Sequence, residues 1–281
     1  MSTARRLLRA LLGACAIGLA SLAQAGQACD TRPPDTLGMA RALALAERLQ
    51  QSLDASGAQV VIVARAGQDL RKYGLTWSHL AFAYREEAPS TASVLARAPV
   101  LGRIGGAAAD GLPAAAPARG TWRIVHKLNQ CGTAEAAVFR QGLAEFFLDT
   151  PFRYEAAYVV PAPEVQAALL RVLTDDQRVV QWHTPAYSVV AYPWSTRYQQ
   201  SNQWALETLA GSLDPAAGTR ARAQAWLQLH DYQPTVLHID ALTRLGGRLT
   251  RANVAFDDHP NEKRFSDHIE TVTVESMFTW M

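Results

Sequence analysis

The chain has 281 residues, of which 49% are hydrophobic and 19% are charged, and its formal net charge is +2. This composition excludes a disordered chain, a collagen and a disulfide-dense miniprotein, because the apolar content is ordinary and only three cysteines occur. The balanced charge, without a polybasic block, argues against nucleic acid and against an anionic membrane surface as partners.

The first 25 residues have the pattern of a secretory signal peptide, in which basic residues precede an apolar run and a small-residue cleavage site. These signals are Arg5, Arg6 and Arg9, the run 11–20, and Ala23-Gln24-Ala25. Cleavage after Ala25 leaves a mature chain of residues 26–281, with 24 basic and 25 acidic side chains. The competing interpretation is a lipoprotein modified at Cys15, which would discard most of the apolar run.

Hydrophobic periodicity predicts the helices and strands of the mature chain. Apolar residues three and four positions apart indicate helices, and short β-branched or alternating runs indicate strands. In chain order we expect a helix over 35–53, strands over 59–64, 78–85 and 121–128, a helix over 132–148, a strand over 154–160, a helix over 163–173, a strand over 187–192, and helices over 201–213 and 219–229. Segments 236–239 and 271–274 have mixed character.

Together these elements predict a single α+β domain over residues 26–281, with a largely antiparallel sheet flanked by helices. Asp35 or Thr36 can cap the first helix. The Gly-, Ala- and Pro-rich stretch 105–120 predicts a surface loop. No stretch after the signal peptide approaches the roughly 18 consecutive apolar residues of a spanning helix, so we expect no stable membrane insertion.

Two histidines lie at matching places on neighbouring predicted strands. His79 stands at the start of one strand and His126 near the end of the next. Antiparallel neighbours can put such side chains on one face and within reach of each other. The alternative for each histidine is an ordinary core or surface imidazole.

A hydroxyl stands at the start of a later predicted helix. Ser201 is followed by Asn202, and backbone N–H groups at a helix start stabilise a developing anion. Gln200 or Gln203 can add a further donor. The simpler interpretation of Ser201 is a helix N-cap, because serine is among the commonest caps.

This arrangement of a histidine opening a strand, a polar group on the next strand and a nucleophile at a later helix start resembles the circularly permuted papain-like fold. That fold occurs in lecithin retinol acyltransferase relatives and permuted NlpC-type amidases. Nearly the whole mature chain also resembles an exported bacterial family named domain of unknown function 2145. The resembling segments are 75–85, Gln141-Gly142-Leu143, 198–207 and Asp257-Asp258-His259-Pro260. That family name implies no activity.

The papain-like resemblance implies an exported hydrolase or acyltransferase acting on an amide or ester of a cell-envelope molecule. His79 would be the base, His126 would orient it, and Ser201 would attack while amides near Ser201 and Asn202 hold the oxyanion. The family uses cysteine where this chain has Ser201, and serine needs a base to remove its proton during attack. Ser201 is therefore an adapted nucleophile or the mark of a lost activity. The alternative function is a non-catalytic envelope module that keeps the cleft for a peptide or acyl group.

Cys131 offers a second candidate nucleophile, five residues after His126 and before a predicted helix. A helix start and an imidazole both lower a thiol pKa. The alternative is a disulfide with Cys29, because these are the two cysteines left after signal removal and the compartment is oxidising.

The remaining candidates carry weaker patterns. The segment 257–262 contains possible metal ligands, but its spacing matches no established loop and a solvated turn is the simpler interpretation. The aromatic residues of 187–204 can line a pocket or pack in the core. The other histidines have no partner pattern, namely His183, His230, His238 and His268. No pattern calls for a cofactor, and the oligomeric state stays open.

We predict that the protein recovered from the periplasm begins at Gly26. Mass spectrometry of its N-terminal peptide checks this expectation, because cleavage after Ala25 follows from the small-residue site. A lipid-modified Cys15 at the N-terminus contradicts it.

Overall fold

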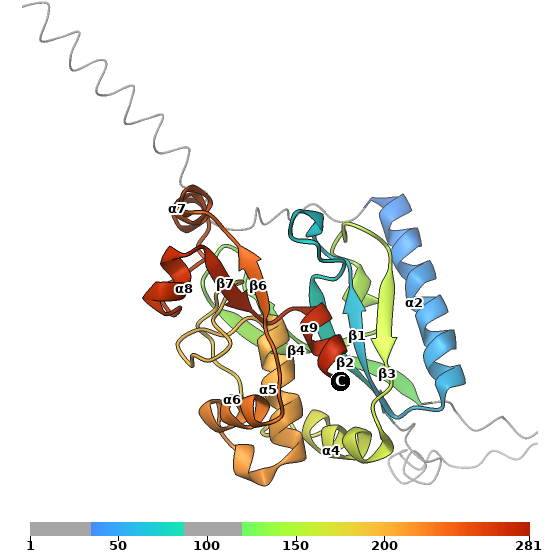
Figure 1. The fold of residues 1–281 in the computed structure, drawn as a ribbon. Helices are drawn as coiled ribbons and strands as arrows, with labels where there is room; N and C mark the ends of the chain where they lie inside the picture. The colour runs from blue at the N-terminus through green and yellow to red at the C-terminus, as the bar shows by residue number, and fades with distance from the viewer. Residues whose placement is uncertain (1–34, 87–119) are drawn as a thin grey trace, which may run out of the picture.

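The computed structural model describes residues 35–86 and 120–281 (Figure 1). The predicted signal peptide, Cys15, Cys29 and all of the predicted loop 105–120 except Gly120 lie outside these residues. The expectations that concern them stay predictions.

A five-stranded antiparallel sheet forms the centre of the fold, in the order β4-β3-β2-β1-β5. The strands are β1 (Val60–Arg65), β2 (His79–Glu86), β3 (Thr121–Asn129), β4 (Ala136–Gly142) and β5 (Ala156–Val159). A separate two-stranded sheet pairs β6 (Thr235–His238) with β7 (His268–Thr271). The prediction of an α+β fold with an antiparallel sheet is confirmed.

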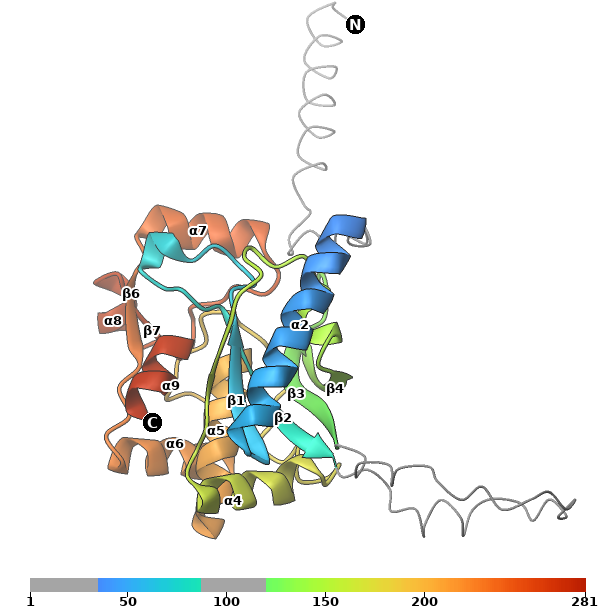
Figure 2. The same ribbon diagram turned by 90° about the vertical axis from the view of Figure 1, so that its right-hand side faces the viewer.

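Helices cover both faces of the five-stranded sheet (Figures 1 and 2). Helix α2 (Thr36–Ser56) packs on one face, and α4 (Pro163–Leu173) and α5 (Ser201–Leu213) pack on the other. The other helices are α6 (Arg220–Leu229), α7 (Ala241–Thr250), α8 (Asn261–Phe265) and α9 (Val274–Trp280), and the short 3-10 helices are η1 (Arg71–Tyr73), η2 (Glu145–Phe147) and η3 (Pro215–Ala217).

Helix α2 forms where the periodicity predicts it. The side chain of Asp35 caps its start by accepting from the Gly38 amide at 2.6 Å. Gly57 ends it in the left-handed conformation, which glycine adopts without strain. Its buried stripe faces the sheet and consists of Gly38, Ala42, Leu45, Ala46, Leu49 and Leu53.

The strands divide their side chains between two apolar cores. In β2, Ala81 and Ala83 face the core beneath α2, whereas Leu80 and Phe82 face the core beneath α5. This alternation follows from the two-residue period of a strand. Whether a polar side chain belongs to the α2 side or the α5 side is therefore set by the parity of its position.

The predicted helix over 132–148 is wrong. The chain turns at Gly132, which has a positive φ of 73°, and returns along β3 as the edge strand β4 before the short helix η2. The Asn129 side-chain amide donates to the carbonyls of Thr133 and Glu135 and closes this turn. A β hairpin forms in place of the helix that the apolar spacing predicts, because β4 completes the backbone hydrogen bonding of β3.

The predicted strand over 187–192 is also wrong. Its backbone has partners, but they lie in several places instead of on one neighbouring strand. The Tyr187 amide donates to Ala134 O at 2.8 Å and the Val189 amide to Asn253 O at 2.9 Å. The segment belongs to the irregular connection between α4 and α5 (residues 174–200), which we call the α4–α5 loop.

Within residues 35–86 and 120–281, no helix is long and apolar enough to cross a membrane.

We predict that Gly211→Ala in α5 destabilises the fold. A Cβ atom there would lie 2.1 Å from two atoms of the buried Trp182 ring, which is held by its hydrogen bond to Ala217 O. Such overpacking costs roughly 1–3 kcal/mol or more, measured by denaturant unfolding. The matched variant Gly246→Ala in α7 meets no atom within 4 Å and should stabilise by about 0.5–1 kcal/mol through helix propensity. Equal effects at both sites contradict the packing described.

Candidate functional site

The side chains of His79 and His126 meet on the α2 side of the sheet. The β2–β3 register pairs Phe82 with Val125, so the next position puts His126 opposite Ala81. His79 shares that face because it lies two residues from Ala81. The Nε2 atom of His79 is 2.9 Å from Nδ1 of His126. The structure thus brings together the two histidines that the sequence places on neighbouring strands.

Both imidazoles are buried against the ring of Phe146, over which the guanidinium of Arg65 also lies. The Phe146 ring centroid lies 5.8 Å from that of His79 and 5.3 Å from that of His126. Arg65 also forms a bidentate ion pair with Asp149 at 2.6 Å. Burial, followed by the charge of Arg65, holds the pKa of His79 well below its usual value and lowers the pKa of His126 to about 4. The pair is uncharged at neutral pH.

Gln141 extends the histidine pair into a chain of three side chains. Its Oε1 lies 2.8 Å from His126 Nε2. Because a neutral imidazole carries one N–H, donation from His126 to Gln141 leaves His126 Nδ1 to accept from His79. Sequence reasoning missed Gln141 because it placed the residue on a helix. The available signal was its place in the Gln141-Gly142-Leu143 segment that resembles the family.

Ser201 lies on the other side of the sheet from His79. It opens α5, whose Trp204 shares one apolar core with Leu80 and Phe82. Its hydroxyl is 3.5 Å from the Tyr187 hydroxyl. His79 packs instead against Phe146 in the α2 core. The structure therefore does not bring His79 to Ser201, and the imidazole is not positioned to act as its base.

The start of α5 is capped by Gln200, so the expectation of Ser201 as the N-cap is wrong. Gln200 Oε1 accepts from the Asn202 amide at 2.8 Å, and Ser201 is the first helical residue. The Asn202 side chain accepts from the Leu80 amide at 2.9 Å and so ties α5 to β2. Gln203 donates to Glu207 and to carbonyls of the α4–α5 loop. These three polar side chains have structural partners.

A pocket of about 330 Å³ lies beside the start of α5. Its lining is small and apolar except for two tyrosines and two arginines, and consists of Ala134, Tyr187, Tyr198, Arg248, Arg251, Ala252, Val254 and Ala255. Tyr187 connects this pocket to the Ser201 hydroxyl. Burial raises the pKa of Tyr187, opposed by hydrogen bonds from the Ser201 side chain and amide. The phenol therefore keeps its proton at neutral pH. Two aromatic residues of 187–204 line a pocket, whereas Trp204 packs in the core.

A buried polar network holds the α4–α5 loop that carries both tyrosines. Glu207 of α5 accepts hydrogen bonds from four side chains, those of Gln199, Gln203, Arg220 and Gln224. Arg220 also donates to three carbonyls of the loop, those of Ser195, Thr196 and Tyr198. The network replaces the regular backbone hydrogen bonds that the loop lacks.

Lys127 joins this network from the sheet. It is buried on the α5 side of β3 and donates to Thr184 O at 2.6 Å and to Gln199 Oε1 at 2.8 Å. Burial, followed by the charge of Arg220, lowers its pKa to about 6, although Glu207 opposes the shift. Lys127 is thus a largely uncharged amine at neutral pH, on the same side of the sheet as Ser201.

Cys131 lies in the exposed turn between β3 and β4. The helix predicted to follow it is a strand, and both ring nitrogens of His126 face Gln141 and His79. Neither feature that was expected to activate the thiol is present. The disulfide with Cys29 stays a prediction, because Cys29 lies outside the described residues.

The segment 257–262 does not form the expected solvated turn. The side chains of Asp258 and His259 are fully buried and contact each other at 3.0 Å. Asp258 also accepts from the Tyr192 amide, and His259 contacts the Glu270 carbonyl, so the pair anchors β7 to the α4–α5 loop. Among residues 35–86 and 120–281, no group of three or more His, Cys, Asp or Glu side chains is arranged to hold a metal ion.

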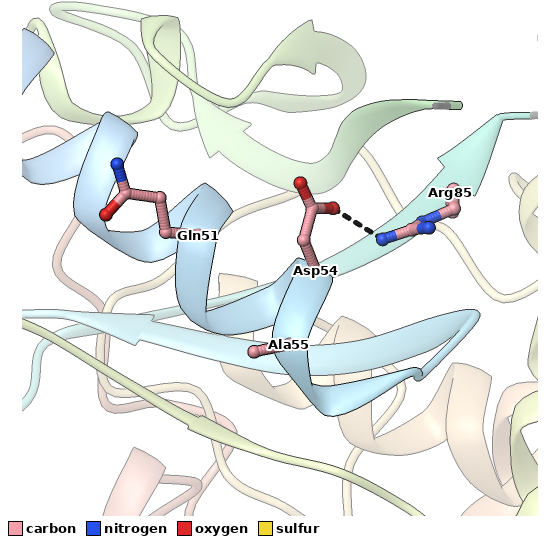
Figure 3. A pocket seen from close by; sticks show the side chains of 4 residues that line it. All are labelled: Gln51, Asp54, Ala55 and Arg85. Atoms are coloured by element: carbon pink, nitrogen blue, oxygen red, sulfur yellow. Dashed lines mark hydrogen bonds and ion pairs between the residues drawn. The ribbon is translucent and has the colours of Figure 1, made fainter. Parts of the chain in front are cut away.

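A second pocket of about 420 Å³ lies between α2 and the end of β2, lined by Gln51, Asp54, Ala55 and Arg85 (Figure 3). The Asp54 carboxylate pairs with Arg85 and accepts from the Trp122 indole at 2.8 Å. The charged groups of this pocket therefore satisfy each other.

The family described as an uncharacterized protein conserved in bacteria, DUF2145, matches residues 52–281. The chain belongs to this family. The matched range contains the histidine chain, the start of α5 and the pocket beside it. Neither a curated protein nor a solved structure matches the chain. The functional argument for this DUF2145 protein therefore rests on its own residues.

We predict that His126 makes the stability of this DUF2145 protein depend on pH. The unfolded state binds the His126 proton near pH 6.5 and the folded state only near pH 4, so stability is full above pH 6.5 and is lost as the pH falls toward 4. The shift corresponds to about 3 kcal/mol. Urea unfolding at a series of pH values measures the loss, and His126→Gln should flatten the slope between pH 6.5 and 4. An unchanged slope in that variant contradicts the buried neutral pair.

Proposed function

We propose that the chain is an exported binding module whose pocket beside α5 holds the anionic group, carboxylate or phosphate, of a cell-envelope molecule. The observation that carries this proposal is the pair Arg248 and Arg251 lining a pocket whose other residues are apolar or aromatic. Guanidinium groups bind carboxylate and phosphate oxygens in bidentate fashion, and tyrosine rings supply rigid contact area. Export places the module where envelope molecules occur.

Charge at the pocket supports an anionic ligand. Arg197 and Arg248 share the carboxylate of Asp257, at 2.9 Å and 3.8 Å. None of the ion pairs among the described residues involves Arg251. The arginines near the pocket thus exceed the carboxylate available to them, and an anionic ligand would supply the missing charge.

We predict saturable binding of octanoate or glycerol phosphate by isothermal titration calorimetry. The double variant Arg248→Gln/Arg251→Gln should lower the affinity for the probe that binds. We expect a loss of at least tenfold, because both guanidinium groups at the pocket are removed. Arg222→Gln removes an exposed arginine of α6 instead and should leave the affinity unchanged. Binding of neither probe, or equal affinity in the double variant, contradicts the proposal.

A second candidate function is acyl chemistry at Ser201, on a permuted papain-like arrangement in which a helix starting with the nucleophile packs across an antiparallel sheet. His79 lies across the sheet, so another base is needed. The Ser201 hydroxyl is 3.5 Å from that of Tyr187, and Lys127 approaches the Tyr187 ring with its Nζ 5.9 Å from the centroid. A lysine with a pKa near 6 suits proton transfer near neutral pH.

The second candidate predicts that a fluorophosphonate probe labels Ser201 at neutral pH. Labelling should disappear in Ser201→Ala and fall strongly in Lys127→Met, because the base that activates the hydroxyl is then absent. Circular dichroism checks that both variants fold. A folded wild-type protein that is not labelled, or labelling that persists in Ser201→Ala, excludes this chemistry and leaves the binding module.

A further inference from the structure

The two-stranded sheet of β6 and β7 presents a pair of histidines on its outer face (Figure 1). In the β6–β7 register, His238 lies directly opposite His268. Leu237 and Ile269, which stand one position along, are buried in a small apolar core. Because the side chains of a strand alternate between its two faces, the histidines face away from this core, and both are exposed. The sequence shows no partner pattern for either histidine, and the strand register supplies one.

The two imidazoles lie in contact across the strands. Their ring centroids are 4.9 Å apart and their planes are inclined by 65°. Directly opposite residues of an antiparallel pair have Cβ atoms about 4.5–5.5 Å apart, which is close enough for two imidazoles to reach one metal ion. The paired strands hold both side chains in place, so an ion bound by one ring meets the second ring intramolecularly.

Ser266 fixes the position of the proton on the His268 ring. The Ser266 hydroxyl has a single proton, which it donates to helix α8 at the carbonyls of Glu262 at 2.7 Å and Lys263 at 3.0 Å. Its oxygen lies 2.9 Å from Nδ1 of His268 and therefore accepts a hydrogen bond there. A neutral His268 thus carries its proton on Nδ1, and the lone pair of Nε2 is left for an ion. Histidines that bind metals use their other N–H in this way.

The ring of His238 is left for an ion as well. Among the described residues, the hydrogen bonds to imidazole nitrogens belong to other histidines. The neighbouring carboxylates are already paired with cations, because Glu270 of β7 contacts Lys263 and Asp267 contacts Arg244. The two imidazoles are therefore the available ligands of this face.

We propose that His238 and His268 form a surface site for one divalent transition-metal ion of the class that imidazole binds, namely Cu²⁺, Ni²⁺ or Zn²⁺. Each ring gives one nitrogen, which is Nε2 in His268, and water fills the other positions. Imidazole suits these ions, whereas Mg²⁺ and Ca²⁺ take oxygen ligands. Structural zinc sites have four protein ligands and catalytic ones three, so a site with two holds an exchangeable ion. The site shares no residue with the pocket beside α5 and does not depend on the proposed function.

Isothermal titration calorimetry with CuCl₂ tests the proposal on the protein recovered without a histidine tag. Wild type should bind one Cu²⁺ per chain, Ni²⁺ more weakly in the order that nitrogen sites follow, and Mg²⁺ not at all. His238→Asn and His268→Asn should each lower the Cu²⁺ affinity at least tenfold, because a single imidazole cannot chelate the ion. Electron paramagnetic resonance of the wild-type complex should show hyperfine splitting from nitrogen ligands.

The matched control is His230→Asn, which removes an exposed histidine whose ring stacks on Trp226 at the end of α6. It should bind Cu²⁺ like wild type. Absence of Cu²⁺ binding by wild type, an equal loss in His230→Asn, or wild-type affinity in both His238→Asn and His268→Asn overturns the proposal. A wild-type spectrum with oxygen ligands alone overturns it without any variant. One ion per two chains, with a dimer that forms only with Cu²⁺, also overturns the single-chain site.

Two variants at Ser266 test the assigned ligand atom of His268. Ser266→Ala removes the acceptor that holds the proton on Nδ1 and should lower the Cu²⁺ affinity at least tenfold, as the loss of such a partner does in other metal sites. Ser266→Thr keeps the hydroxyl and should restore the wild-type affinity. Unchanged affinity in Ser266→Ala, or an equal loss in Ser266→Thr, overturns the assignment of Nε2 as the ligand.

Discussion

The carboxylate of Glu207 holds together the part of the protein in which the pocket forms. It is buried within α5 and accepts from Arg220 and three glutamine side chains, while Arg220 extends to the backbone of the α4–α5 loop. A buried ion pair is stable only when its remaining hydrogen-bonding capacity is satisfied, and this network satisfies it with loop carbonyls and amides. The loop is ordered by these polar contacts rather than by regular secondary structure.

The central sheet separates two polar groups that differ in chemistry. On the α2 side, His79, His126 and Gln141 form a hydrogen-bonded chain beneath Phe146, with imidazoles that stay uncharged. On the α5 side, Lys127 and Ser201 stand near the pocket. A shift of one position along a strand moves a side chain from one group to the other. The histidine chain therefore lies beneath α2, across the sheet from Ser201.

The sequence predicts those elements whose structure is determined by residues close together in the chain. Helix α2 is predicted from Asp35 and its apolar stripe, and β1 from its β-branched run. The helix starting at Ser201 is predicted with the residue bounds that the structure shows. The wrong predictions at 132–148 and 187–192 depend on distant partners. Pairing of β4 with β3 overrides helical spacing, and contacts to Ala134 and Asn253 replace a strand ladder. The pairing of His79 with His126 is predictable because both strands are recognised from local patterns and are neighbours in the sheet. Gln141 and the pocket arginines depend on contacts that no local pattern specifies.

Hydrogen–deuterium exchange in Glu207→Gln tests the role of this carboxylate most directly. This substitution leaves Arg220 without its buried anion. The backbone amides of residues 182–199 should then exchange at least tenfold faster than in wild type, whereas those of α2 should exchange at the wild-type rate. Asp176→Asn, which removes the exposed partner of Arg140, provides the matched control and should change neither region. Unchanged protection of residues 182–199 in Glu207→Gln would contradict the account.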